Sequence, residues 1–425
     1  MGDSHSAYKL LRGAPALDLQ QRTRLQTDFD QFARQGLPLR FEDYLLDRYQ
    51  IDVRADYGGF ALKNPWGKAS GQLSMTAGQV AEDVEAGLGF VVLKTLIAED
   101  ARGGQTMNAW AVKESKMVAE RIQGLDGDAG WTISWKGRGW WQSFDEYLQL
   151  VRAARNLARD RGVLIVPSCK YHLPMPNESA WCEDEYRHTT QKLCESWFAG
   201  GEPSSTWPLE KDFSPTLAGS DRASVEGQIL EWLRKTPGLI RNALPGAPAV
   251  RVGLKLFNSL FDDEFQLELL RTIHAPGQSR PDYFVYGNRL FDPGREFDGH
   301  LGIAYGGPDL SRRNLLVMSR FYSHRLEAGE SPLPWSATGD ITTGQMALEY
   351  ALRGATSFQL HTFFQLPASE YAMQVGNKSQ KALLQLNLHP ETGFVPWLLH
   401  LARRLGLTSR PLRFLDVVGR MDQLR

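Results

Sequence analysis

Residues 337–362, ATGDITTGQMALEYALRGATSFQLHT, contain the pattern that decides the fold. A short apolar run ends in a glycine-containing loop, an amphipathic stretch follows, and a second apolar run begins at Phe358. This order predicts a strand, a helix and a second strand. Strands that are joined through a helix lie parallel in one sheet. The stretch therefore predicts one βαβ unit.

The same order recurs along most of the chain. Eight apolar runs are expected to be strands, and amphipathic stretches lie between most of them. Eight alternating units favour a (β/α)₈ TIM barrel, of class α/β, over an open doubly wound sheet. The expected strands are residues 66–71, 89–95, 163–171, 207–213, 250–257, 283–288, 334–339 and 358–364, and the expected helices are residues 77–87, 184–198, 225–244, 262–273, 312–326 and 342–355.

The barrel is expected to span residues 57–365. Residues 1–56 are expected to form an N-terminal helical extension, and residues 366–425 a C-terminal helical tail. Residues 101–142, rich in glycine and tryptophan, interrupt the repeat after the second strand. Loops at that end of a barrel strand surround the active site, so this insertion is a candidate lid or substrate wall. A surface hairpin that packs its tryptophans on the barrel is the alternative.

The composition excludes several classes of protein. The 425 residues carry a net charge of −1, so there is no overall attraction for nucleic acid or for an anionic membrane. Uninterrupted apolar runs stay far shorter than a membrane span requires. Three cysteines do not make a disulfide scaffold, and we expect a cytoplasmic protein. Cys169, Cys182 and Cys194, with two nearby histidines, fit no zinc spacing, so no metal is expected.

Lysines recur at the ends of successive strands. Lys94, Lys170, Lys211 and Lys255 fall near one rim of the expected barrel, whereas Glu210 and Asp212 alternate with Lys211 and are expected to face the other way. A buried ammonium group is costly without an anion. The counter-charge could therefore be a ligand, such as a cofactor phosphate or an acidic substrate. Alternatively, some of these lysines point outward with their tips in water.

Glycines lie near the ends of the last strands. Ala337–Gly344 and the segment AYGGP (304–308) offer close backbone approach, and the loops after the last two barrel strands commonly bind phosphate.

The chain contains the motifs NPWGKASG (64–71), AGLGFVVLKTL (86–96), VGLKLF (252–257) and residues 337–362. In these motifs it resembles the dihydroorotate and dihydropyrimidine dehydrogenase family of FMN-dependent barrels. The similarity covers about residues 57–365. It implies an FMN-dependent oxidoreductase that acts on a carbon–carbon single or double bond. Two residues depart from the family pattern. Asp340 stands where glycine is usual, and His361 stands where glycine or tyrosine is usual. The resemblance implies flavin contacts from Ala69, Ser70, Lys94, Lys255, Asn288, Gly306, Gly307, Thr338, Gly339, Asp340, His361 and Thr362.

The pattern breaks after the fourth strand. The resemblance makes Ser214 the catalytic base and gives Lys255 a catalytic role, but Lys211 and Thr216 replace the two asparagines that hold a pyrimidine ring in the family. We therefore expect an anionic substrate other than dihydroorotate, held by Lys211 and Thr216, with Asn108 as a further contact. Ser214 could instead cap a backbone N–H, and Lys211 could be a solvated strand-end lysine.

Other functions stay open at this level. A binding or scaffold relative that keeps the barrel is one alternative, and a flavoenzyme of secondary metabolism with oxygen-dependent or non-redox chemistry is another. The expected partners are a small anionic substrate, an electron acceptor that the sequence does not identify, and a second copy of the chain in a homodimer. There is no dinucleotide-binding glycine loop and no Cys-x-x-Cys pair.

Overall fold

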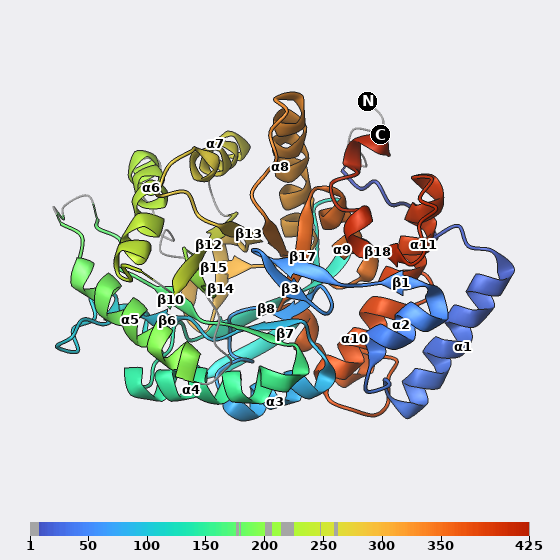
Figure 1. The fold of residues 1–425 in the computed structure, drawn as a ribbon, viewed down its shortest axis with the longest axis horizontal. Coiled ribbons are helices and arrows are strands. Elements are labelled where there is room, and N and C mark those ends of the chain that lie inside the picture. The colour runs from blue at the N-terminus through green and yellow to red at the C-terminus, as the bar shows by residue number, and fades with distance from the viewer. Residues whose placement is uncertain are drawn as a thin grey trace.

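A computed structural model describes residues 8–175, 178, 180–199, 206–213, 225–246, 248–258 and 262–424 (Figure 1). Over these residues the chain is a mixed α/β protein built on one curled, barrel-like parallel sheet of ten strands. In order across the sheet, the strands are β6 (Leu96–Ile97), β10 (Ser168–Lys170), β11 (Thr206–Asp212), β12 (Ala249–Phe257), β13 (Tyr283–Asn288), β16 (Trp335–Thr338), β17 (Ala355–Leu360), β4 (Trp66–Lys68), β5 (Phe90–Val92) and β9 (Leu164–Val166).

The two ends of this strand order are close in the chain. Strands β5 and β6 are separated only by residues 93–95, and β9 and β10 only by Pro167. Strand β5 pairs with β9, and β10 pairs with both β6 and β11. The sheet is therefore curled so that its first and last strands belong to the same two stretches of chain.

Helices surround the sheet (Figure 1). Several begin where the sequence supplies a side-chain cap. Thr76 and Gln79 form a capping box at α3, and Ser143 and Glu146 form one at α4. The helices are α1 (Leu19–Gln35), α2 (Phe41–Tyr49), α3 (Ala77–Ala86), α4 (Phe144–Ala158), α5 (Glu183–Ala199), α6 (Glu226–Asn242), α7 (Asp263–His274), α8 (Pro308–Glu327), α9 (Gly344–Leu352), α10 (Lys378–Leu388) and α11 (Phe394–Arg404).

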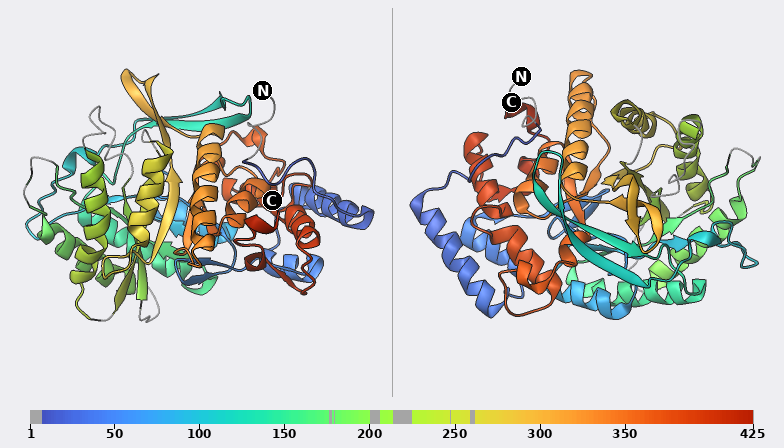
Figure 2. Two further views of the ribbon diagram at one scale, coloured as in Figure 1. Left: turned by 90° about the horizontal axis from the view of Figure 1, so that it is seen from above. Right: turned by 180° about the vertical axis from the view of Figure 1, so that it is seen from behind.

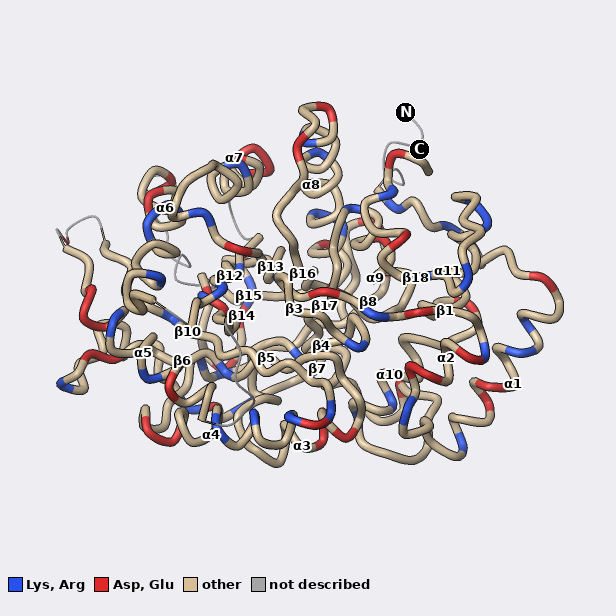
Figure 3. The backbone as a smooth tube through the Cα atoms, viewed as in Figure 1, with Lys and Arg blue, Asp and Glu red and all other residues tan. Residues whose placement is uncertain are grey.

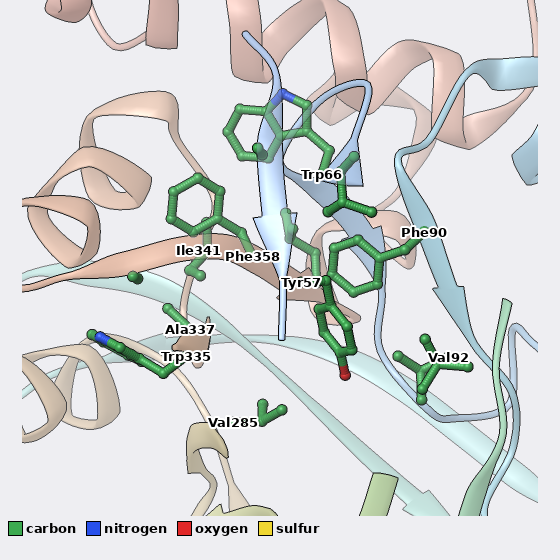
Figure 4. Close-up of a cluster of buried hydrophobic side chains, with 14 of the residues drawn as sticks. Tyr57, Trp66, Phe90, Val92, Val285, Trp335, Ala337, Ile341 and Phe358 are labelled. Carbon is green, nitrogen blue, oxygen red and sulfur yellow. The ribbon is translucent and has the colours of Figure 1, made fainter. Parts of the chain in front are cut away.

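The core joins the sheet to the C-terminal helices. Trp66 and Phe358, on neighbouring strands, are buried with ring centroids 5.3 Å apart (Figure 4). Phe394 of α11 lies 5.1 Å from the Trp66 ring. Apolar burial of this kind drives folding at about 25 cal/mol per Å². The C-terminal segment is therefore part of the same hydrophobic core as the sheet.

The N-terminal and C-terminal segments pair with each other. Strand β1 (Ile51–Asp52) runs parallel to β18 (Leu412–Arg413). Strands β2 (Ala55–Tyr57) and β3 (Phe60–Leu62) form an antiparallel pair, and Tyr57 is buried against Phe90 and Tyr283.

Each of the eight expected strands overlaps an observed one, although the last begins at Ala355, three residues earlier than expected. The sequence did not predict all of the observed elements. Helix α4 lies between the insertion and β9, and an antiparallel hairpin, β14 (Leu290–Phe297) and β15 (His300–Tyr305), follows β13. The insertion itself forms a second antiparallel hairpin, β7 (Lys116–Gln123) and β8 (Ala129–Lys136). Both hairpins lie in front of the sheet when the molecule is viewed from behind (Figure 2, right).

Gly344 tests the packing of α9 on the C-terminal helices. A Cβ at Gly344 would collide with the backbone of Phe394 and of Leu386, whereas a Cβ at the exposed Gly78 of α3 would meet only Thr76 Oγ1, at 3.9 Å. We expect Gly344→Ala to lower the free energy of unfolding by about 3 kcal/mol or more, because backbone cannot yield as a side chain does. The matched control Gly78→Ala should be neutral or slightly stabilising. Urea unfolding measures both, and equal effects would contradict this packing.

Candidate functional site

A cavity lies at the carboxyl ends of the parallel strands. It collects residues that follow or end β4, β5, β10, β11, β12, β13, β16 and β17, together with residues of the insertion and of the second hairpin. Ligands bind at this edge of parallel sheets because loops and helix N-termini converge there. The lining includes every flavin-contact residue expected from the sequence except Gly307, which precedes α8: Ala69, Ser70, Lys94, Lys255, Asn288, Gly306, Thr338, Gly339, Asp340, His361 and Thr362.

Lys255 belongs to a buried polar cluster inside the sheet. Its ammonium group donates to Gln359 Oε1 at 3.2 Å and lies 3.7 Å from Glu210 Oε1. Gln359 Nε2 and the Tyr57 hydroxyl both donate to Glu210 Oε2, at 2.5 and 3.0 Å. Glu210 therefore faces the interior of the sheet, and the expectation that it faces away is wrong.

Lys94 also has a counter-charge within the chain. Its ammonium group lies 2.6 Å from Glu114 Oε1, and Glu114 belongs to the insertion. Burial still lowers the pKa of Lys94, although the Glu114 carboxylate acts in the opposite direction. The counter-charges of Lys94 and Lys255 thus include protein carboxylates, so these two lysines do not depend on a ligand for charge balance.

Lys211 does not line the cavity. It is fully buried, and its ammonium group donates to the carbonyl oxygens of Tyr171 and Asp212, at 3.3 and 3.2 Å. The Asp212 side chain lines the cavity instead. The expected orientation of Lys211 and Asp212 is therefore wrong, because β11 is buried on both faces and its hydrophobic pattern does not distinguish them.

The other expected substrate contacts are also unsupported. Asn108 is exposed in the short 3₁₀ turn Asn108–Trp110 and is absent from the cavity lining, which contains Trp110 instead. Ser214 and Thr216 lie outside the described residues, as does Pro215 between them.

A chain of hydroxyl groups ends at Asp212. Thr95 Oγ1 lies 2.7 Å from Ser70 Oγ and 3.2 Å from Ser168 Oγ, and it donates to Asp212 Oδ2 at 3.3 Å. Asp212, Thr95 and Ser70 all line the cavity, so this carboxylate is a candidate acid or base for a bound molecule. Sequence reasoning missed Asp212 because it placed that residue on the opposite face.

Arg289 connects the two hairpins that cover the cavity. Its guanidinium group donates to the carbonyl oxygens of Ile133, on β8, and Ala304, on β15, and lies 4.0 Å from the centre of the Trp135 ring. Arg289 Nε is buried and has no hydrogen-bond partner among the described residues. Burial lowers the pKa of Arg289 to about 9, and the neighbouring Arg295 acts in the same direction.

Several other polar atoms of the lining also lack partners within the part of the chain that the structure describes. They are both amide atoms of Gln72 and both ring nitrogens of His361. Burial lowers the pKa of His361 to about 3, so the ring is neutral at ordinary pH. Buried polar groups without partners are uncommon in folded proteins, so these atoms are available to a bound ligand or water.

These residues fit a flavin mononucleotide, with one qualification at Asp340. Unpartnered donors at Gln72 and Arg289, with Lys94 and Lys255, suit the polar edge of a flavin and its phosphate. Asp340 accepts a hydrogen bond from Ser311 Oγ at 2.8 Å, and burial raises its pKa to about 7. A protonated Asp340 removes the repulsion that a carboxylate would exert on a phosphate.

No protein-family model matches the chain, and no curated protein matches it. Within the described ranges, His, Cys, Asp and Glu side chains form no group of three that could hold a metal ion. None of the helices in the described part of the chain combines the length and apolar character that a membrane crossing requires. Basic and acidic residues are interspersed along the backbone (Figure 3).

Lys211 predicts a pH dependence of stability. Burial, followed by repulsion from Lys170, lowers its pKa from 10.5 to about 7. The unfolded chain therefore binds a proton that the folded chain lacks between about pH 7 and 10.5, so stability rises with pH across this window.

We expect Lys211→Met to be more stable than the wild type at pH 7, with the difference shrinking towards pH 10. Urea unfolding at several pH values measures it, and Lys192→Met, at a half-exposed position on α5, controls for loss of a lysine. A stability difference between Lys211→Met and the wild type that does not vary with pH would contradict the lowered pKa of Lys211.

Proposed function

We propose that the chain is an FMN-dependent oxidoreductase that acts on a carbon–carbon single or double bond of an anionic substrate other than dihydroorotate. The observation that carries the proposal is that the residues named from the family motifs meet at one cavity. Residues from segments as far apart as 69–70, 94, 255 and 338–362, chosen from sequence motifs alone, line one cavity. Strand ends converge in any parallel barrel, so the support lies in the individual residues: all but one of the flavin contacts named from the motifs line the cavity.

The proposal includes a closed (β/α)₈ barrel. We infer that β5 with β6, and β9 with β10, are each one barrel strand interrupted by a short irregularity. The ten strands then become eight. The pairing of β5 with β9 and of β10 with β11 supports this closure.

Within the cavity, each side chain has an expected task. Lys94 and Lys255 would hold the polar edge of the flavin ring, and Arg289 would meet the phosphate near Gly339. When bound, a flavin accepts a hydride from a substrate carbon. The protein must orient that carbon, exclude water and remove a proton from the neighbouring carbon.

Two groups are candidates for the proton acceptor. The resemblance assigns it to Ser214. Asp212 is the alternative from the described residues, because its carboxylate lines the cavity and is connected through Thr95 to two further hydroxyl groups. The cytoplasmic location, the homodimer and the electron acceptor stay predictions from the sequence.

Asp340 favours a second candidate function, a relative that keeps the fold and binds no flavin. A carboxyl group in the phosphate loop would weaken FMN binding whenever it is ionised. Flavin uptake separates the two functions.

Flavin binding is the first test. We expect the purified protein to bind one FMN per chain, and to bind riboflavin, which lacks the phosphate, about tenfold or more weakly, because a charge-assisted pair with Arg289 is lost. Arg289→Gln should remove this preference. Fluorescence titration measures both ligands, and Arg295→Gln, whose side chain pairs with Glu120 at 2.8 Å, is the control. A protein that takes up neither flavin would support the scaffold function.

The substrate class is tested by anaerobic reduction of the FMN-loaded protein. We expect dihydroorotate to reduce the flavin slowly or not at all, because the asparagines that hold a pyrimidine are replaced. At least one member of a panel of saturated carboxylates should reduce it faster, and Asp212→Asn should slow that reaction about 100-fold or more if Asp212 is the base. Rapid reduction by dihydroorotate would contradict the altered substrate.

A further inference from the structure

One end of the cavity is formed by the insertion. Trp110 and Arg138 line it beside Lys170 at the end of β10. The Arg138 guanidinium lies 4.4 Å from the centre of the Trp110 ring, and the Lys170 ammonium group lies 4.9 Å from the same point. Two cations therefore contact one aromatic side chain, and the charge of Arg138 repels that of Lys170.

The backbone fixes Arg138 in this place. Its N–H donates to the Val112 carbonyl at 2.9 Å, and the N–H of Gly139 donates to the Trp110 carbonyl at 2.8 Å. Gly137 has a φ of +131°, and a Cβ there would lie 2.7 Å from Glu114 Cγ. Only glycine lets the chain pass this close to the segment that holds Trp110 and Glu114.

Most of the cations that line the cavity have an acidic neighbour. The described residues of the lining include five basic side chains and two acidic ones, Asp212 and Asp340. Lys94 and Lys255 have Glu114 and Glu210 nearby. The negative charge of Asp212 interacts with the ammonium group of Lys170. Among the described residues, Arg138 has no carboxylate partner.

We propose that Arg138 and Lys170 bind a carboxylate group of the substrate, with Trp110 holding the two cations in position. This inference rests on the proposed function and names the part of the site that selects the substrate. A planar guanidinium fork matches a carboxylate in two hydrogen bonds. A carboxylate next to the reacting bond also makes the neighbouring C–H more acidic, and fixed cations stabilise the charge that develops when this proton leaves.

The same insertion provides a matched control. Lys113 lies 4.7 Å from the centre of the Trp141 ring, yet neither residue lines the cavity. A cation on tryptophan is therefore also present where no ligand can reach it from the cavity. The position of Arg138 at the cavity, beside Lys170, is what distinguishes the proposed carboxylate site.

Benzoate and its uncharged analogue benzamide test the proposal by isothermal titration calorimetry on the full chain. We expect benzoate to bind the wild type more tightly than benzamide does. Arg138→Gln and Lys170→Gln should each weaken benzoate binding about tenfold or more and leave benzamide binding unchanged. Arg138→Lys should retain part of the affinity, and Lys113→Gln should bind as the wild type does. Arg138 is exposed, so its variants are expected to fold.

Two results would overturn the carboxylate site: a wild type that binds no benzoate, or an Arg138→Gln variant that binds it as tightly as the wild type. Flavin uptake is measured separately on the same proteins. Benzoate binding that depends on Arg138 in a protein without flavin affinity would keep this site and reject the oxidoreductase. Flavin uptake with benzoate binding that is independent of Arg138 would do the reverse.

Discussion

The need to balance ammonium groups inside a parallel sheet determines much of this structure. Lys94 and Lys255 are buried at the ends of their strands, where an uncompensated charge would be strongly destabilising. Glu210 is the counter-charge of Lys255, Gln359 accepts a hydrogen bond from Lys255, and Gln359 and Tyr57 both donate to Glu210. The interior of the sheet is therefore polar near its carboxyl end, whereas Trp66 and Phe358 pack on the outer face of the sheet, against Phe394 of α11 (Figure 4).

The same constraint explains why the peripheral segments belong to the central body. Tyr57 comes from the N-terminal strand pair, and Glu114 comes from the insertion, so each supplies a polar group that the sheet requires. The two hairpins then cover the cavity, joined by Arg289 between Ile133 and Ala304. Excluding water in this way strengthens every electrostatic contact below the hairpins.

Part of this arrangement could be predicted from the sequence. Alternating apolar runs gave the parallel strands, and motif order placed Lys94, Lys255, Gly339 and His361 at one cavity. The orientation of Lys211 could not be predicted, because both faces of β11 are buried and the usual alternation of apolar and polar residues is absent.

The sequence predicted that the insertion could form a wall of the site, and residues of the insertion do line the cavity. The individual contacts of the two hairpins could not be predicted, for a different reason. Glu114, Arg138 and Arg289 act through contacts between segments far apart in the chain, and no local pattern specifies such contacts. A signal was present, however, in the glycines on either side of Arg138, which mark a close approach of backbone.

A crystal structure of the protein grown with FMN tests the central claim most directly. The account predicts the flavin ring in the cavity beneath the two hairpins, with Lys94 and Lys255 at its polar edge and its phosphate towards Arg289. A flavin bound elsewhere, or a cavity that remains empty at saturating FMN, would contradict it.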